Sequence, residues 1–261
     1  MVPASEDGPA LPAIVHQTIG TIDEGWIVWA HGGSWHQGSA VDWQRATGSL
    51  AALSGRNVLS LDYRLAPQDR HPAAVLDMLT AVRWVRHIAP GSPISVGGDS
   101  AGGTIAALAA IAARDRGEAL HSQLLAYPPI DPECRAASYH GEHTAFPPPE
   151  RLRAAWRSWN GSSQAAAQAA DGTRLLVSPR DADSLVGVCH AVLVVGDRDP
   201  VRDDVADYAD RLRNAGVRVD HRVLPGVEHG DVLRLSSTVV GELAAAIPDF
   251  PQKIQRKEGL S

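Results

Sequence analysis

A serine stands at the centre of residues 97–103, which read G-G-D-S-A-G-G. This segment follows the apolar run 94–96 and precedes the alanine-rich run 104–113, so the pattern predicts a strand, a sharp turn and a helix. Glycines two residues before and after Ser100 are needed because a Cβ there would collide with the neighbouring strand and helix. A turn of this kind lifts the hydroxyl above a sheet edge, which makes Ser100 the candidate nucleophile.

A serine hydroxyl is a poor nucleophile near neutral pH, so a base must take its proton and a carboxylate must orient that base. His229 is the candidate base because it lies in the loop after the last expected strand, from which it could reach back to Ser100. Asp197 and Asp199 compete for the role of orienting carboxylate at the end of the preceding strand. We favour Asp199, because Pro200 opens a helix and leaves the Asp199 side chain in the strand-end loop. Asp197 could instead form a surface ion pair with a neighbouring arginine.

Attack on a carbonyl carbon would create an oxyanion, which fixed N–H donors must stabilise. One donor is the amide of Ala101, at the positive end of the helix that it begins. Further donors are expected from the loop 31–34, which reads H-G-G-S, because its glycines let the backbone turn amides toward a substrate. We expect the His31 side chain to brace this loop by hydrogen bonds.

Apolar runs and turn signals alternate along the whole chain. Strands are expected at 13–21, 26–30, 57–63, 94–96, 122–127, 191–195 and 217–224. Helices are expected from Pro72 to a stop at Pro90, over 104–113, around 152–159, at the alanine-rich 165–170, over 201–215 and around 239–247. The alternation predicts an α/β fold with a mostly parallel sheet and helices on both faces.

Length and composition favour one globular domain over 1–261, with 44% apolar and 21% charged residues among its 261. Residues 1–12, rich in proline and acidic side chains, are expected to form a loose arm. The net charge of -6 argues against nucleic acid and acidic membrane surfaces as partners. No cofactor or metal motif is present in the sequence.

The cellular setting is expected to be the reducing cytoplasm. Only two cysteines are present, Cys134 and Cys189, and we interpret them as lone thiols rather than a disulfide. The chain also has no N-terminal apolar segment typical of a signal peptide and no apolar run of membrane-spanning length.

Five motifs resemble the hormone-sensitive-lipase-like esterases of the α/β-hydrolase superfamily. In that family the order nucleophile, acid and base matches Ser100, Asp199 and His229, and the resemblance implies an α/β-hydrolase fold and ester hydrolysis. It also implies that the N–H groups of Gly33, Ser34 and Ala101 form the oxyanion hole. The motifs, in order, are His31-Gly-Gly-Ser-Trp35, Asp62-Tyr-Arg-Leu-Ala-Pro67, Gly98-Asp-Ser-Ala-Gly-Gly103, Asp199-Pro-Val-Arg-Asp203 and His229-Gly230.

Three departures from the family pattern concern the substrate pocket. Ser34 replaces the third glycine of the oxyanion loop, and Gln68 stands where the family usually has glutamate. The N-terminal arm is short, whereas family members usually carry a helical cap segment there. We therefore expect a pocket that is open on that side or closed by a second subunit in a homodimer. Kynurenine-formamidase-like hydrolases share the short N-terminal arm and the H-G-G-x-W pattern.

Aromatic residues are the candidates for the pocket wall. Trp35 and His36 follow the oxyanion loop, while Trp156 and Trp159 lie in an insertion, about 130–178, that is expected to form a small lid. Such a wall suits a flat or acyl-rich substrate, and the open side favours a bulky, specialised secondary metabolite over short esters. The alternative interpretation is that the tryptophans only cover the core.

Hydrolysis of a carboxylic ester through an acyl-Ser100 intermediate is the function that these residues favour. Formamide hydrolysis, or acyl transfer, cyclisation or elimination at the same site, is the alternative within catalysis. A ligand-binding protein on an inactive hydrolase fold belongs to a different class. The presence of Ser100, Asp199 and His229 together disfavours that last interpretation.

Overall fold

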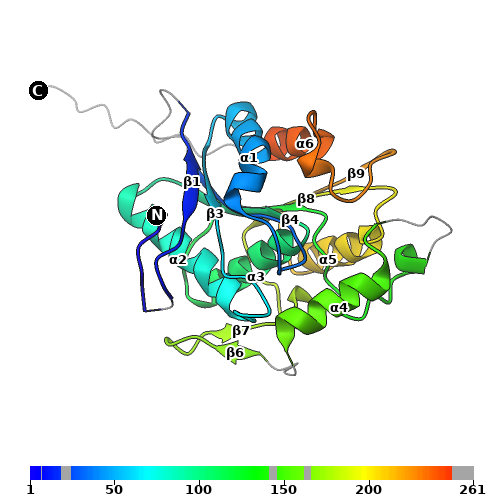
Figure 1. Ribbon diagram of the computed structural model, residues 1–261, viewed down its shortest axis with the longest axis horizontal. Coiled ribbons are helices and arrows are strands. Elements are labelled where there is room, and N and C mark those ends of the chain that lie inside the picture. The colour runs from blue at the N-terminus through cyan, green and yellow to red at the C-terminus, as the bar shows by residue number, and fades with distance from the viewer. Residues whose placement is uncertain (7, 19–24, 141–145, 162–165, 249–261) are drawn as a thin grey trace, which may run out of the picture.

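A seven-stranded sheet forms the centre of the structure. The computed structural model describes residues 1–6, 8–18, 25–140, 146–161 and 166–248 (Figure 1). The strand order is β1-β3-β2-β4-β5-β8-β9, and every neighbouring pair is parallel except β1 with β3. The strands are β1 (Ala13–His16), β2 (Trp26–Ala30), β3 (Asn57–Leu61), β4 (Ile94–Asp99), β5 (Ser122–Ala126), β8 (His190–Gly196) and β9 (Val219–Leu224).

Helices cover both faces of this sheet, as the alternating pattern predicts. On one face lie α1 (Ala40–Ser54) and α6 (Thr238–Ala246), which contact each other (Figure 1). The opposite face carries α2 (Ala73–Ile88), α3 (Ala101–Asp115) and α5 (Arg202–Asn214). Strands β2 to β5 are buried along their whole length because helices lie above and below them. The predicted fold class is confirmed.

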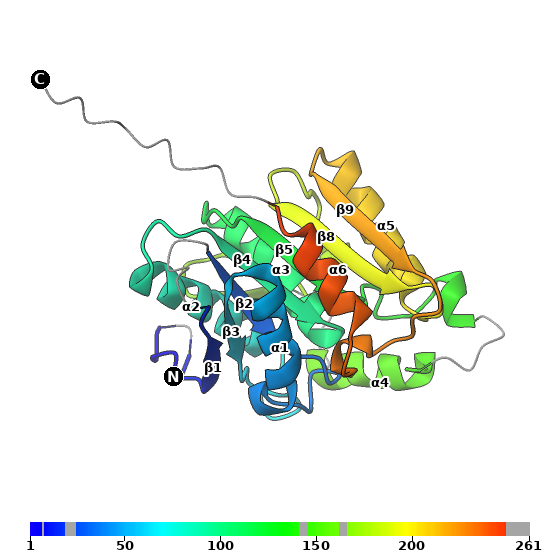
Figure 2. The same cartoon turned by 90° about the horizontal axis from the view of Figure 1, so that it is seen from above.

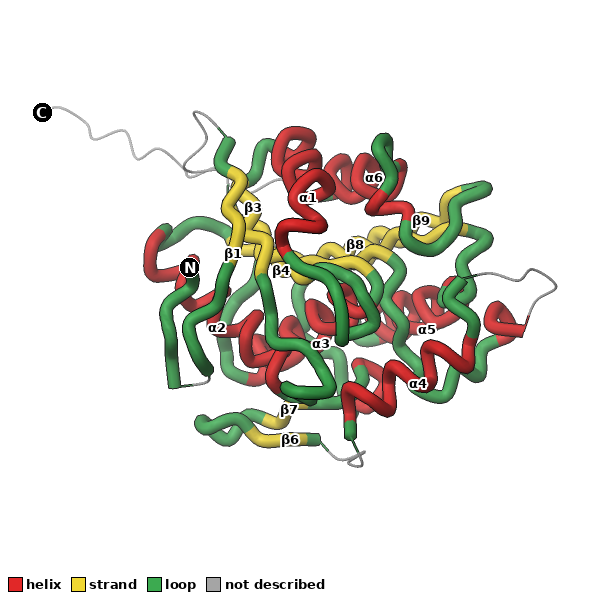
Figure 3. Tube along the Cα trace, in the orientation of Figure 1, coloured by secondary structure: helices red, strands yellow, loops and turns green. Residues whose placement is uncertain are grey.

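The insertion between β5 and β8 lies beside the sheet edge at which the central strands end (Figure 2). It contains the 3-10 helices η1 (Ala137–His140) and η2 (Pro179–Asp181), α4 (Pro149–Asn160), and a short ribbon of β6 (Ala167–Gln168) and β7 (Arg174–Leu175) (Figure 3). Helix α4 buries Leu152, Ala155, Trp156 and Trp159, the face that the spacing predicts. Positions 141–145 and 162–165 of the expected lid lie outside the described residues.

The N-terminal segment differs from the expected loose arm. The backbones of Val2 and Leu11 exchange hydrogen bonds of 2.8 and 2.9 Å. Their side chains are 0% and 3% exposed, because both pack into the main core. The following strand ends at His16, and positions 19–21 of the expected 13–21 strand lie outside the described residues.

Two further elements differ from the expectations. A helix is expected at the alanine-rich 165–170, of which position 165 lies outside the described residues; residues 166–170 contain strand β6, paired antiparallel with β7, since pairing overrides the helix propensity of alanine. Helix α1 is not expected from the sequence pattern. Its start is capped by Ser39, whose side chain accepts the N–H of Asp42, and Gly55 ends it in a left-handed conformation.

Candidate active site

Three side chains from three strand-end loops meet at the carboxyl edge of the sheet. Ser100 follows β4, Asp199 follows β8 and His229 follows β9. The Oγ of Ser100 lies 2.9 Å from Nε2 of His229, and Nδ1 of the same ring lies 2.9 Å from Oδ2 of Asp199. The Asp199 and His229 side chains are 0% and 5% exposed, so water competes little for their hydrogen bond. The imidazole is placed to take the serine proton while the carboxylate orients the ring.

The turn that carries Ser100 requires its two flanking glycines. Ser100 has φ 51° and ψ -122°, a conformation that non-glycine residues rarely adopt. A Cβ on Gly98 would lie 2.4 Å from the backbone of Gly102, and one on Gly102 would lie 2.0 Å from the carbonyl oxygen of Ala30. The N–H of Ser100 donates to the carbonyl of Ala126 over 2.9 Å, which fixes the turn against β5.

The structure separates the two aspartates that compete in the sequence. Asp197 is exposed, and its Oδ1 accepts the N–H of Gly226 over 2.7 Å, which closes the turn after β9. Asp199 is buried, accepts the N–H of Val201 over 2.9 Å and faces His229. Only Asp199 of the two is therefore placed to orient the imidazole.

The predicted oxyanion donors lie in an unusual stretch of backbone. Gly33 and Ser34 both have positive φ, 113° and 55°, which turns the chain sharply after β2. A Cβ on Gly33 would lie 1.9 Å from the carbonyl oxygen of Gln37, so glycine is required there. Within the part of the chain that the structure describes, the N–H groups of Gly33, Ser34 and Ala101 donate to no protein atom. Three donors thus remain available for a developing oxyanion.

The His31 side chain braces this loop as expected. Its Nδ1 donates to the carbonyl of Gly32 over 2.6 Å, and its ring stacks on Tyr63 with centroids 4.3 Å apart. The Tyr63 hydroxyl in turn donates to the His31 carbonyl over 2.8 Å. Because all of these groups are buried, the start of the oxyanion loop is held on both its carbonyl oxygens.

Asp99 joins the nucleophile strand to the oxyanion loop. Strands β2 and β4 are neighbours in register, so Asp99 stands beside the loop, and its Oδ1 accepts the N–H of Gly32 over 3.1 Å. Complete burial raises the pKa of Asp99 to about 7, although the hydrogen bond from Gly32 lowers it. The carboxyl group directly before Ser100 therefore titrates near neutral pH.

Replacement of Asp99 by asparagine is expected to flatten the dependence of stability on pH. An aspartate in the unfolded chain loses its proton near pH 4, whereas Asp99 in the folded protein loses it at about pH 7. The folded state holds this proton more tightly, so the resulting stabilisation is full below about pH 4 and is lost as pH rises to about 7. Asparagine keeps the acceptor for Gly32 and does not titrate. Urea unfolding measures this at pH 4.5 and pH 8. Between these two values, the free energy of unfolding of Asp99→Asn should rise by about 3 kcal/mol relative to that of the wild type. The same change with pH in both proteins would contradict this assignment.

Comparison with known proteins places the chain in a family. The α/β-hydrolase fold family matches residues 27–233. The chain belongs to this family. Carboxylesterase NlhH of Mycobacterium tuberculosis (strain CDC 1551 / Oshkosh) is 36% identical over 215 residues, covering 79% of this chain and 66% of that protein. The ethyl acetate hydrolase of Pseudomonas putida is 32% identical over 220 residues, covering 82% and 67%. The chain thus spans about two thirds of the length of these relatives.

A solved structure places this hydrolase-fold chain more narrowly. The solved structure is that of an esterase from the bacterial hormone-sensitive lipase family. It matches this chain with a TM-score of 0.79 and 30% sequence identity, and the match covers 90% of this chain and 79% of the other. Together with the five motifs, this match confirms the resemblance to hormone-sensitive-lipase-like esterases.

The predicted aromatic wall differs in the structure. Trp35, Trp156 and Trp159 are 0%, 1% and 1% exposed and pack against one another. The Trp35 ring stacks on that of Trp159, with centroids 4.9 Å apart and 7° between the ring planes, and it is tilted by 47° to that of Trp156, with centroids 4.4 Å apart. Mutual packing removes these three rings from water, so they do not form an exposed wall, and the alternative of a core-covering cluster describes them better. His36 is exposed and lies outside this tryptophan cluster.

Tyr127 is a residue of the site that the sequence analysis missed. It directly follows β5 and is fully buried, and its ring lies 4.6 Å from the imidazole of His229. Its hydroxyl accepts the N–H of Val232 over 3.1 Å, so it holds the loop that carries His229. One signal for this role was available in the sequence. Tyr127 lies at the carboxyl end of the strand that follows the nucleophile strand, where the side chains of a site gather in a parallel sheet.

The Tyr127→Phe variant should position His229 less well. Phenylalanine keeps the ring contact but leaves the buried N–H of Val232 without an acceptor. We expect kcat for an aryl ester to fall about fivefold to tenfold, with KM little changed. Steady-state kinetics check this, and an unchanged kcat would show that the hydroxyl does not position the loop.

Metal-binding groups of side chains and membrane-spanning helices are both absent from the described residues. Over residues 1–6, 8–18, 25–140, 146–161 and 166–248, no three His, Cys, Asp or Glu side chains are grouped so as to hold a metal ion. Among these same residues, no helix has the length and apolar character needed to cross a bilayer.

Proposed function

We propose that this chain hydrolyses carboxylic esters through an acyl-Ser100 intermediate. The observation that carries the proposal is the unbroken hydrogen-bond chain from Ser100 Oγ through His229 to Asp199. The free N–H groups of Gly33, Ser34 and Ala101 support it. The loop with Gly33 and Ser34 follows β2, which pairs with the nucleophile strand β4, and Ala101 directly follows Ser100.

The geometry allows both halves of the reaction. His229 accepts the hydroxyl proton as Oγ attacks the carbonyl carbon, and the resulting oxyanion is stabilised by the donors of Gly33, Ser34 and Ala101. Protonated His229 then gives its proton to the departing alkoxide, which leaves an acyl-Ser100 ester. A water molecule deprotonated by His229 attacks this ester, and collapse of the second tetrahedral intermediate releases the acid and restores Ser100.

The names of the relatives support esters over the alternative substrates. One is named a carboxylesterase, another an ethyl acetate hydrolase, and the solved structure is an esterase. None of these names favours formamide hydrolysis or acyl transfer.

Labelling with a fluorophosphonate tests the proposal. The reagent phosphonylates activated serines, so intact-protein mass spectrometry should show one adduct, and peptide mapping should place it on Ser100. Hydrolysis of p-nitrophenyl acetate should be lost in parallel with labelling. Labelling without hydrolysis would favour acyl transfer, and a chain that neither labels nor hydrolyses would be a ligand-binding protein.

We propose short acyl groups as the preferred acid part of the ester. Trp35 directly follows the oxyanion donor Ser34 and is buried in the tryptophan cluster, which leaves this side of the loop filled. The expectation of a bulky substrate depended on an open side of the pocket and on an exposed aromatic wall across which the substrate would lie, and the structure does not have that wall. The relative named for ethyl acetate supports the same proposal.

A p-nitrophenyl ester series measures the acyl preference. We expect kcat/KM for the acetate to exceed that for the octanoate at least about tenfold, because burying a longer chain here would require the indoles to separate. A value that rises with chain length would contradict the short-acyl proposal and restore the larger substrate.

We also propose a reducing, cytoplasmic compartment. Cys134 and Cys189 are both unpaired in the structure. Burial raises the pKa of each thiol to about 12, so both stay protonated at neutral pH. Recovery of the chain in the cytosolic fraction of its own cells checks this.

A further inference from the structure

A cavity of about 290 Å³ lies at the base of the insertion, apart from Ser100, Asp199 and His229. Its wall combines the start of the insertion, one face of α4 and the segment that returns to β8. Four arginines line it, Arg135, Arg153, Arg157 and Arg180, together with the ring of Trp156. The volume is just below the usual range for small-molecule sites, about 300 Å³ and above, which suits a small ligand.

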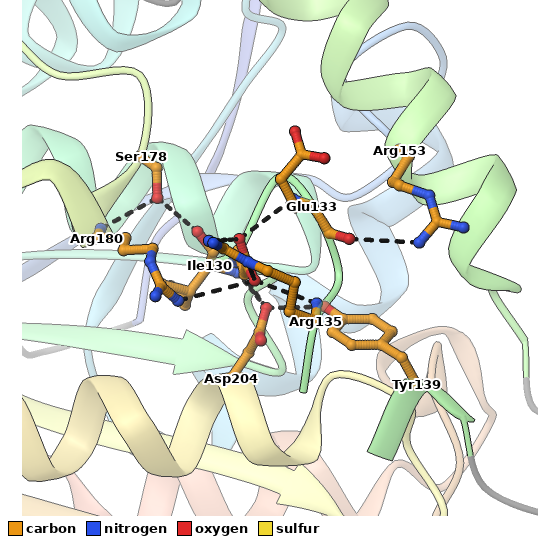
Figure 4. Close-up of polar contacts among 9 residues, drawn as sticks. Ile130, Glu133, Arg135, Tyr139, Arg153, Ser178, Arg180 and Asp204 are labelled. Atoms are coloured by element: carbon orange, nitrogen blue, oxygen red, sulfur yellow. Dashed lines mark hydrogen bonds and ion pairs between the residues drawn. The ribbon is translucent and has the colours of Figure 1, made fainter. Parts of the chain in front are cut away.

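The frame of this cavity is fixed by buried hydrogen bonds. Ser178 donates its hydroxyl to the carbonyl of Ile130 over 2.5 Å, which ties the two ends of the insertion together (Figure 4). Asp204 on α5 accepts the N–H groups of Ile130 and Asp131 and the hydroxyl of Tyr139, each over 2.8 Å. The cavity is therefore preformed, and a ligand would not have to order its walls.

Two of the three carboxylates that line the cavity, those of Asp131 and Asp181, are engaged, whereas the Glu133 carboxylate forms no ion pair with a described residue. Asp131 accepts the Nε and Nη2 of Arg135, both over 2.8 Å, and Arg180 approaches it to 3.7 Å. Burial is the largest single influence and opposes ionisation, but the hydrogen bonds from Arg135 and the Glu133 N–H, together with the Arg135 charge, outweigh it and lower the pKa of Asp131 to about 2. Asp181 accepts the N–H of Ser178 over 3.1 Å. The four arginines of the lining outnumber its three carboxylates by one positive charge, and the arginines of α4 are not the ones that pair with Asp131.

Helix α4 presents unused donors to the cavity. Arg153, Trp156, Arg157 and Asn160 follow the spacing i, i+3, i+4 and i+7, so they share one face of the helix. Arg153 contacts the carbonyl of Glu133 over 3.3 Å (Figure 4), while Arg157 has no ion pair with any described residue. The buried indole N–H of Trp156 has no acceptor within the described chain.

We propose that this cavity binds a small organic anion, a carboxylate or a phosphate, between Arg153, Arg157 and the indole N–H of Trp156. Guanidinium groups pair with both kinds of oxyanion, and the indole supplies a further donor in a site partly shielded from water. Pro132 and Val177 add apolar wall for the carbon part of the ligand. The site goes beyond ester hydrolysis, although Trp156 also packs on Trp35, which directly follows the oxyanion loop, and so links the two regions.

Calorimetric titration of the full chain with phenyl phosphate, benzoate and phenol tests the proposal. None of the three is a carboxylic ester, so binding can be measured on the wild type and on Ser100→Ala alike. We expect both anions to bind. Phenol has the same aromatic ring but no charge at neutral pH, and it should show no heat of binding. The tighter of the two anions then identifies the ligand class as phosphate or carboxylate. Equal heats for phenol and the anions would overturn the proposal, whatever the esterase assays show.

Arginine variants locate the site on α4. Arg153→Gln and Arg157→Gln should each weaken anion binding about tenfold, the loss expected for one charge-assisted contact. Arg151→Gln is the matched control, since Arg151 lies on the same helix over the ring of Phe146, outside the cavity. Equal weakening by Arg151→Gln would show only general attraction to positive charge, and full binding by Arg157→Gln would also contradict the proposal. Thermal melts confirm that each variant is folded.

Discussion

Ser100→Ala should lower kcat for p-nitrophenyl acetate by roughly 10⁵- to 10⁶-fold, because no other group can form the acyl intermediate. Alanine removes only Oγ. The backbone donors and the hydrogen bond between His229 and Asp199 stay in place, so a residual rate of about 10³- to 10⁴-fold over water is still expected. Substrate hydrolysis is followed spectrophotometrically, with excess enzyme to detect the residual rate.

Ser236→Ala supplies the matched control for this experiment. Ser236 is exposed and lies outside the hydrogen-bond chain of the site, so its variant should keep full activity and the fluorophosphonate adduct. If Ser100→Ala still formed a covalent adduct on another residue, the assignment of the nucleophile would be wrong.

Local sequence patterns were sufficient to find Ser100, Asp199 and His229, although not Tyr127. The turn at Ser100 needs glycines at Gly98 and Gly102 because the backbones of α3 and β2 approach within 2.0 to 2.4 Å of where their Cβ atoms would lie. This requirement for glycine concerns only a few neighbouring residues, so it can be detected in the sequence. The loops carrying Asp199 and His229 follow clear apolar runs, and parallel strands bring their carboxyl ends to one edge.

Features that depend on distant contacts could not be derived in the same way. Trp35 meets Trp156 and Trp159 from another part of the chain, and only their mutual packing decides that the rings are buried. The pairing of Val2 with Leu11 likewise depends on the core that covers them. In both cases the partner that buries these residues was not predictable from spacing.

Helix α1 shows a different limit. Its interior contains Thr47 and Gly48, which are weak helix formers, and its polar residues interrupt the apolar pattern. The helix forms because Trp43 and Leu50 pack into the core and Ser39 caps its start. Tertiary packing thus overrides a weak local preference.

Asp199→Asn should lower kcat about 10⁴-fold, whereas Asp197→Asn should change it less than about threefold. The Asp199 carboxylate accepts the Nδ1–H of His229 and so keeps Nε2 free as the base toward Ser100. An asparagine amide would turn its own N–H₂ toward Nδ1 and favour the tautomer with the proton on Nε2, which cannot accept the serine proton. The variant also loses the negative charge that stabilises the imidazolium.

The Asp197→Asn variant is a matched control for this loss, because it makes the same chemical change two residues away in the same loop. Asparagine at 197 keeps an oxygen to accept the N–H of Gly226, so the turn after β9 should stay closed. Steady-state kinetics of both variants on p-nitrophenyl acetate decide between the two aspartates. A larger loss for Asp197→Asn would transfer the orienting role to the exposed carboxylate and would mean that His229 swings away from Asp199 when substrate binds.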